Sequence, residues 1–137
     1  MNTKTIVAGV IGGIAFYLLG WLFYGMLLMD FFEANSGTAT GVMREPDEMV
    51  MWSLILGHLV WGYLLAYIFN HWANISTWDG GAKAGALLGV LMSMSMGMVW
   101  YGTSNIGTML SGAADVVVSG VMSAIAGAII GWWLGRK

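Results

Sequence analysis

Four long apolar stretches, separated by shorter polar segments, make up most of the chain. They cover residues 5–29, 49–69, 80–101 and 113–134. Each is long enough to cross a hydrocarbon core of about 30 Å as a helix. Helices are the expected conformation because lipid offers the backbone no hydrogen-bond partners. The pattern therefore predicts a single all-α domain over residues 1–137, a bundle of four transmembrane helices.

Composition supports a lipid environment. Hydrophobic residues make up 58% of the 137 residues and charged residues only 9%, whereas soluble domains carry about 25% charged residues. The chain has no cysteine, which excludes disulfides, thiolate metal sites and thiol nucleophiles. Its net charge of −2 excludes a basic nucleic-acid surface.

The basic residues predict how the spans are oriented. On the predicted topology, four of them fall on one side of the membrane: Lys4, Lys83, Arg136 and Lys137. Only Arg44 falls on the other side. Because loops rich in Lys and Arg stay in the cytoplasm, both termini are expected to be cytoplasmic.

Glycine and serine recur at intervals of four in the last two spans. The third span has Gly81, Gly85, Gly89, Ser93 and Gly97, and the fourth has Ser119, Ser123, Gly127, Gly131 and Gly135. Residues four apart share a helix face, and small residues let membrane helices approach closely. We therefore expect these two helices to pack antiparallel, groove to groove, along nearly their whole length. The predicted packing residues are Gly85, Gly89, Gly97, Ser123, Gly127 and Gly131.

A weak internal echo appears at an offset of 77 residues. Gly12, Gly20, Tyr24 and Gly25 match Gly89, Gly97, Tyr101 and Gly102. If this echo reflects a repeat, the fold is two helical hairpins related by an axis along the membrane normal.

Polar residues at mid-membrane depth mark a candidate ligand site. His58 lies near the centre of the second span, with Tyr17, Ser93, Ser95 and Ser123 at similar depth. Because polar groups in lipid must find partners, His58 is expected to face the bundle interior and to hydrogen-bond Tyr17 or a serine. Two interpretations stay open: a ligand-binding or proton-accepting site, or a neutral histidine that only joins helices.

Asp115 is the second candidate. It lies near the outer boundary of the fourth span. It is either a partly hydrated carboxylate stabilised by the helix dipole, or one wall of an outward-facing cavity. On the second interpretation, four residues lie nearby in depth: Asp30, Asn105, Tyr24 and Tyr101.

The stretch LMSMSMGM, residues 91–98, alternates methionine with small residues. Methionine fills irregular gaps, but thioethers also bind copper(I), and Met92 and Met96 share a helix flank. Gap filling is the simpler interpretation. The chain has no nucleophile–base constellation, phosphate loop or paired-histidine motif. These observations predict a non-enzymatic protein with no cofactor and no metal site.

Three segments resemble a small bacterial membrane-protein family, domain of unknown function 1761. They are GWLFYGMLLMDFF (residues 20–32), GGAKAGALLG (80–89) and AIAGAIIGWWLG (124–135). In that family an adjacent Trp–Tyr signature near the end of helix one precedes a short amphipathic stretch. Here Trp21 and Tyr24 are two residues further apart. The resemblance implies a four-helix protein of the inner (plasma) membrane and no assigned activity.

Three classes of function remain from the sequence. The first is a protein that binds or passes a small solute or ion, with Tyr17, His58 and Ser93 lining the site. The second is an accessory subunit of a larger membrane complex. The third is an enzyme, or a copper handler using Met92, Met96 and His58. Small-residue faces left over, at Gly120, Ala124 and Ala128, predict a homo-oligomer or a membrane-protein partner.

Overall fold

The computed structural model describes residues 2–137, which form helices and connecting loops with one isolated bridge between Ser36 and Gly107. Four helices in these residues are long and apolar enough to cross a membrane: Thr3–Leu27, Met51–Trp72, Trp78–Thr103 and Met109–Leu134. Their ends differ from the expected bounds by at most four residues. The all-α, four-span architecture is therefore confirmed.

The first two spans each end in a π-helical turn. α1 (Thr3–Leu22) continues into η1 (Phe23–Leu27) and is followed by the short α2 (Met29–Ala34). A 3₁₀ turn, η2 (Pro46–Glu48), precedes α3 (Met51–Tyr67), which continues into η3 (Ile68–Trp72). α4 (Trp78–Thr103) and α5 (Met109–Leu134) are uninterrupted. π-helical turns often accompany functional sites, and η1 contains Tyr24.

Short polar side chains start three of the long helices. The Asn2 side chain accepts from the backbone N–H of Lys4, and the Thr77 side chain accepts from that of Gly80. Thr108 and Ser111 form a reciprocal capping box at the start of α5. Each cap satisfies N–H groups that the helix itself leaves free, so it fixes where the helix begins.

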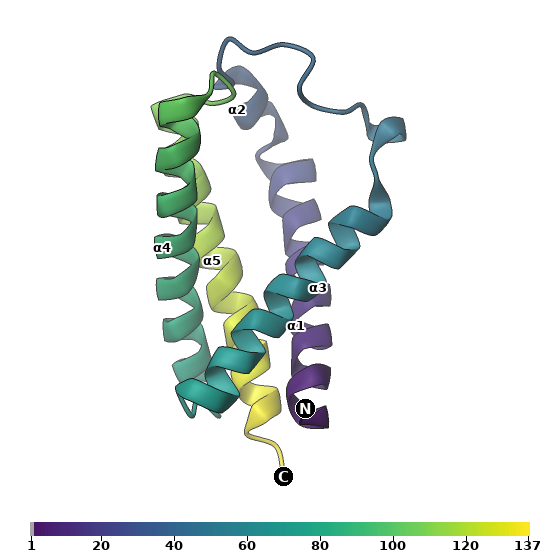
Figure 1. Cartoon of the computed structure of the whole chain (residues 1–137), viewed down its shortest axis with the longest axis vertical. Helices are drawn as coiled ribbons and strands as arrows, with labels where there is room; N and C mark the ends of the chain where they lie inside the picture. The colour runs from purple at the N-terminus through teal and green to yellow at the C-terminus, as the bar shows by residue number, and fades with distance from the viewer. Residues whose placement is uncertain (1) are drawn as a thin grey trace.

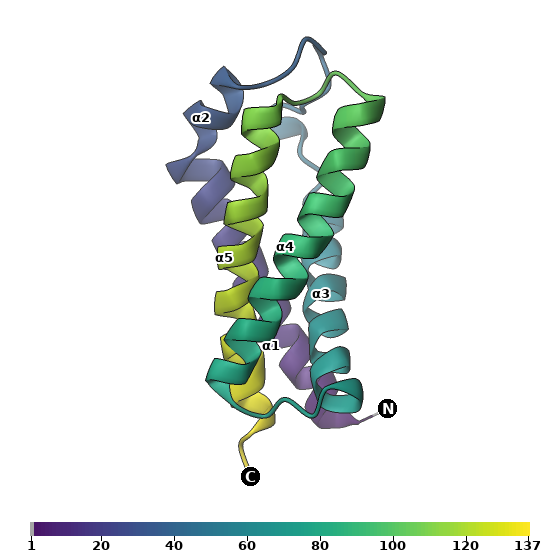
Figure 2. The same ribbon diagram turned by 90° about the vertical axis from the view of Figure 1, so that its left-hand side faces the viewer.

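The helices form two hairpins, α1 with α3 and α4 with α5. The contacts within each hairpin are extensive, α1 also packs on α5, and α3 and α4 barely touch. Both termini lie at one end of the bundle, and α2 lies at the other (Figures 1 and 2). We call these the termini end and the loop end. Figure 1 shows α3 leaning away from α4 and α5 toward the loop end.

Glycines bring α4 and α5 together in the half of the bundle nearer the termini. A Cβ on Gly81 would collide with the Gly127 carbonyl, and one on Gly85 would collide with the Ser123 carbonyl. At Gly89 a Cβ would meet the Ser123 side chain. Gly127 and Gly131 are equally close to backbone atoms of residues 77–81. These backbones touch as closely as small residues permit.

The expected groove does not extend to Gly97. No atom lies within 4 Å of a Cβ built at this position. An i, i+4 stripe turns by about 40° around the helix at each step, so four steps from Gly81 carry the stripe off the contact face. Figure 2 accordingly shows α4 separating from α5 toward the loop end. The prediction that Gly97 packs against a neighbouring helix was wrong.

The other hairpin uses glycine in the same half. A Cβ on Gly9 would meet the backbone of Tyr63, and one on Gly62 would collide with the backbone of Gly13. Gly12 faces Ile130 of α5 and thereby joins the two hairpins. Around these contacts lies the buried core, which consists of Ala8, Phe16, Leu65, Ala66, Phe69, Val118, Met122, Ala126, Ile130 and Leu134.

Hydrogen bonds between residues 35–39 and residues 105–108 also join the hairpins at the loop end, and we call this set of contacts the loop tie. The backbone N–H of Gly37 donates to the Ile106 carbonyl at 2.9 Å, and that of Ala39 donates to the Asn105 carbonyl at 3.0 Å. The Thr108 hydroxyl donates to the Asn35 carbonyl at 2.9 Å. A Cβ on Gly37 would collide with Asn105. The hairpins are therefore joined by helix packing in the half nearer the termini and by these loop contacts at the loop end.

The outward helix surfaces are apolar. Large hydrophobic side chains are exposed along all four spans, among them Leu18 (55%), Val60 (59%), Leu87 (60%) and Val117 (65%). A water-soluble monomer rarely exposes continuous apolar surface on this scale. The four apolar spans are those of a multi-pass helical membrane protein.

Candidate functional site

A pocket of about 470 Å³ lies between the two hairpins, nearer the loop end than the termini end. It is open rather than enclosed, and most of its lining is apolar. Its walls come from α1, η1, α3, α4 and α5. The lining residues are Phe16, Tyr24, Ser53, Leu54, Gly57, His58, Trp61, Gly89, Met92, Ser93, Met96, Asp115, Ser119, Met122 and Ser123.

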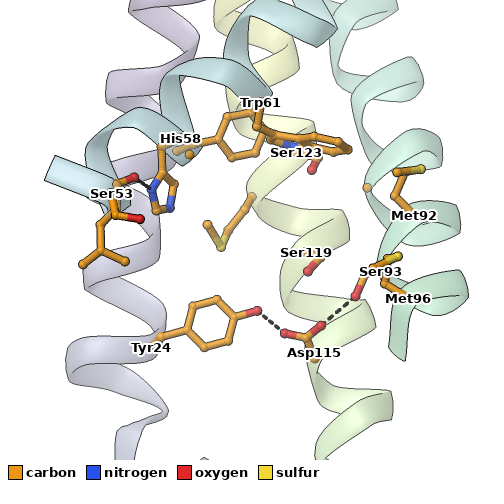
Figure 3. A pocket seen from close by; sticks show the side chains of 15 residues that line it. Tyr24, Ser53, His58, Trp61, Met92, Ser93, Met96, Asp115, Ser119 and Ser123 are labelled. Atoms are coloured by element: carbon orange, nitrogen blue, oxygen red, sulfur yellow. Dashed lines mark hydrogen bonds between the residues drawn. The ribbon is translucent and has the colours of Figure 1, made fainter. Parts of the chain in front are cut away.

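Asp115 joins three helical segments at one side of this pocket (Figure 3). The Tyr24 hydroxyl of η1 donates to Asp115 Oδ1. The Ser93 hydroxyl of α4 donates to Asp115 Oδ2 at 2.7 Å. An ionised carboxylate only accepts hydrogen bonds, and here a donor contacts each oxygen. Of the residues placed near Asp115 by depth, Tyr24 contacts it, whereas Asp30, Asn105 and Tyr101 do not line the pocket.

His58 lines the same pocket from α3. Its Nδ1 lies 2.6 Å from the carbonyl oxygen of Leu54, one turn earlier in the same helix. Since a carbonyl can only accept, Nδ1 carries the proton, and a neutral ring then presents a lone pair at Nε2. Nε2 has no hydrogen-bond partner within residues 2–137, and it is not buried. The expected hydrogen bond from His58 to Tyr17 or a serine is therefore replaced by one within its own helix.

Tyr17 lies beside His58 but outside this pocket. The two rings meet edge to face, with centroids 5.7 Å apart. Tyr17 lines a smaller pocket of about 220 Å³ together with Gly13, Ile14, Ile55 and Leu59. The structure therefore places Tyr17 beside the His58 ring but not in the pocket that Ser93 lines.

Ser93 and Ser95 point in different directions. Ser93 is half-buried and bonds Asp115, whereas Ser95 is exposed and lines neither pocket. Two residues correspond to about 200° around a helix, so neighbours at this spacing face opposite sides. The structure therefore places Ser95, which the sequence grouped with Ser93, outside the pocket.

The pocket walls also contain residues that the sequence interpretation left out of the site. Ser119 lies between Asp115 and Ser123 at steps of four along α5. Ser53, Gly57 and Trp61 are likewise four apart on α3. Figure 3 shows Ser119 and Ser123 on one helix and Ser53 and Trp61 on another, with the pocket between them. The spacing of four was the available signal, because such residues share a helix face.

The methionines line the pocket without forming an evident metal site. Met92 and Met96 lie on the α4 side, whereas His58 lies on the α3 side, and Figure 3 shows them on different sides of the open space. A copper(I) site needs its soft ligands directed at one point. Within the part of the chain that is described, no three His, Asp or Glu side chains come together.

Comparison with family models, with curated proteins and with solved structures gives no match for this chain. The resemblance to the domain of unknown function 1761 family therefore stays a prediction.

Proposed function

We propose that this chain is a non-enzymatic integral membrane protein that binds a small solute in the pocket between its two hairpins. The observation that carries the proposal is the open space of about 470 Å³ bordered by His58 and Asp115. Ionisable groups within membrane spans are costly and usually serve a function. Ligand sites are commonly apolar pockets of about 300–1,000 Å³ with a few polar groups, and this pocket fits that description.

Two further properties belong to this proposal. The excess of basic residues at the end that carries both termini supports a cytoplasmic location for that end, which labelling of single cysteines from either side would check. The pocket would then lie in the outer half of a bacterial inner membrane.

We also propose that the chain works as a homo-oligomer or with a membrane-protein partner, because Ala124 and Ala128 present small faces on α5. Gly120, expected on the same free face, is buried against Val90 of α4.

The accessory-subunit alternative receives less support. An accessory role predicts a closely packed bundle, whereas α3 and α4 barely touch and an open pocket lies between the hairpins. Copper handling also receives less support, since Met92 and Met96 lie across the open pocket from His58. Loss of a bound copper ion in Met96→Leu would revive that alternative.

Thiol accessibility tests the proposal directly because the chain has no cysteine of its own. A Ser119→Cys variant places one thiol in the pocket wall. In lipid nanodiscs it should react with the small neutral reagent methyl methanethiosulfonate. The matched variant Ala126→Cys places a thiol in the buried core of the same helix, so it should stay unmodified. Equal lack of reaction at both positions would refute an accessible pocket.

A plugging variant then shows that the reagent passes through this pocket. Gly57 lines the pocket, and nothing lies within 4 Å of a Cβ built there, so Gly57→Leu should fill space without disturbing the backbone. We expect it to slow modification of the Ser119→Cys thiol about tenfold, which is the effect of about 1.4 kcal/mol. Gly102→Leu is the control, since Gly102 is equally uncrowded but lies outside the pocket.

A further inference from the structure

The rim of the pocket lies along the seam between α3 and α4. These two helices are the neighbours that barely touch, while the other walls are held by helix packing. Leu54 on α3 is 41% exposed, and Met92 and Met96 on α4 are 44% and 53% exposed. All three line the pocket within membrane spans. These exposed lining residues on both helices offer a ligand that dissolves in the bilayer a route between α3 and α4.

The charge of the pocket is uncompensated. Asp115 is the one carboxylate in the lining, and none of the lining residues is Lys or Arg. Within residues 2–137 the ion pair that forms is Lys83–Asp79, at a different place on α4. A carboxylate in a mainly apolar site is costly without a positive partner. A cationic ligand would supply that partner.

The unused hydrogen-bonding positions of the pocket are mainly acceptors. The Tyr24 and Ser93 hydroxyls already donate to Asp115. The Asp115 carboxylate retains further lone pairs, and Nε2 of a neutral His58 ring has one. Serine hydroxyls serve in either direction. A ligand that complements this set carries N–H donors as well as positive charge.

The rest of the lining suits an apolar body attached to such a charge. Phe16, Trp61 and Met122 face the pocket beside Leu54. Aromatic faces attract cations, and Trp does so most strongly. A volume of about 470 Å³ accommodates a compact hydrocarbon group.

We propose that the solute is a hydrophobic amine in its protonated form, which enters from the bilayer between α3 and α4 and binds with its ammonium group at Asp115. This inference rests on the proposed function, since it names the class of solute for the same pocket. His58 contributes a further polar side chain to the α3 wall of the same pocket.

Four ligands with the same hydrocarbon cage separate charge from hydrogen bonding. They are adamantan-1-amine, its N,N,N-trimethylammonium derivative, adamantan-1-ol and adamantane-1-carboxylate. Binding to the full chain in lipid nanodiscs is measured by calorimetry at neutral pH, and the signal from empty nanodiscs is subtracted. The amine should bind most tightly, then the trimethylammonium ion, then the alcohol, and the carboxylate should bind most weakly.

Substitution at Asp115 tests the assigned partner. Asp115→Asn should weaken amine binding about tenfold or more and change alcohol binding by less than about twofold, because a hydrogen bond to a charged group is lost. Asp115→Glu keeps the charge and should retain most of the amine affinity. Asp30→Asn is the control, since Asp30 is an exposed acid on α2 outside the pocket. If Asp115→Asn does not fold, the order of the four ligands on the unmodified chain still decides.

The possible results separate the two proposals. If the alcohol binds as tightly as the amine, the cation inference is wrong. The proposed function survives in that case, provided that methyl methanethiosulfonate reaches the Ser119→Cys thiol. If none of the four ligands binds and the thiol is unreactive, both proposals fail.

Discussion

The two halves of this bundle use glycine differently. In the half nearer the termini, glycines on facing helices are in backbone contact, as at Gly62 with Gly13 and at Gly85 with Ser123. In the half nearer the loops, Gly57, Gly97, Gly102 and Gly112 have no atom within 4 Å of a Cβ position. The helices of the loop half are held instead by the polar contacts of Asp115 and by the backbone tie between residues 35–39 and 105–108.

This difference explains why a chain this small contains a pocket. Backbone contact at one end sets the helices at an angle to each other, because i, i+4 rows are inclined to the helix axis. The helices then separate toward the other end, where the loop tie limits how far they move apart. Polar side chains become available to a ligand at the depth where close packing stops.

The largest expected effect is at the contact between α4 and α5. Gly85→Val places side-chain atoms against the Ser123 carbonyl, so it should lower the free energy of unfolding by about 3 kcal/mol. Gly97→Val changes the same helix at an uncrowded position and should cost less than about 0.5 kcal/mol. Unfolding by SDS in mixed micelles, followed by circular dichroism, measures both. Equal losses would contradict the difference between the halves.

The next effect tests the polar contact of the loop half. Tyr24→Phe removes the hydroxyl that donates to Asp115 while leaving the ring in place. It should lower the free energy of unfolding by about 2 kcal/mol, which is typical of a hydrogen bond to a charged group. Tyr101→Phe is the control, because Tyr101 is 51% exposed and lies outside the pocket. The same SDS titration applies, and a loss no larger than that of the control would show that packing alone holds this half.

The fold was largely predictable because its main signal is local. Length and hydropathy alone place the four spans. Glycines that recur every four residues identify the contact faces of α4 and α5, at Gly85 and Gly127. Where this contact ends was not predictable from the spacing. The end depends on the angle at which the two helices cross and on how far the loop tie lets them separate, and both are properties of the packed bundle.

The candidate site was predictable in part. Depth along the spans brought His58, Ser93 and Asp115 to attention, and all three line the pocket. Depth says nothing about direction around the helix, so Ser95 was included although it faces away. The hydrogen bond of His58 to the Leu54 carbonyl was missed because a partner on another helix was assumed. The spacing of four residues that relates Ser119 to Asp115, and Trp61 to Gly57, indicated shared helix faces and so identified both residues as part of the pocket wall.

The smallest expected effect compares two glycines five residues apart on α3. Gly57 has open space around it, so Gly57→Ala should raise the free energy of unfolding by about 0.5 kcal/mol through the higher helix propensity of alanine. At Gly62 a Cβ would collide with the Gly13 backbone, so Gly62→Ala should lower stability by about 1–2 kcal/mol despite the same gain in propensity. SDS titration of both variants gives the sign of each change. A loss at Gly57 would mean that α3 meets another helix in the loop half, as it would if a second copy of the chain covered the seam. Opposite signs would show that close packing ends between these two positions, at the depth where His58 faces the pocket.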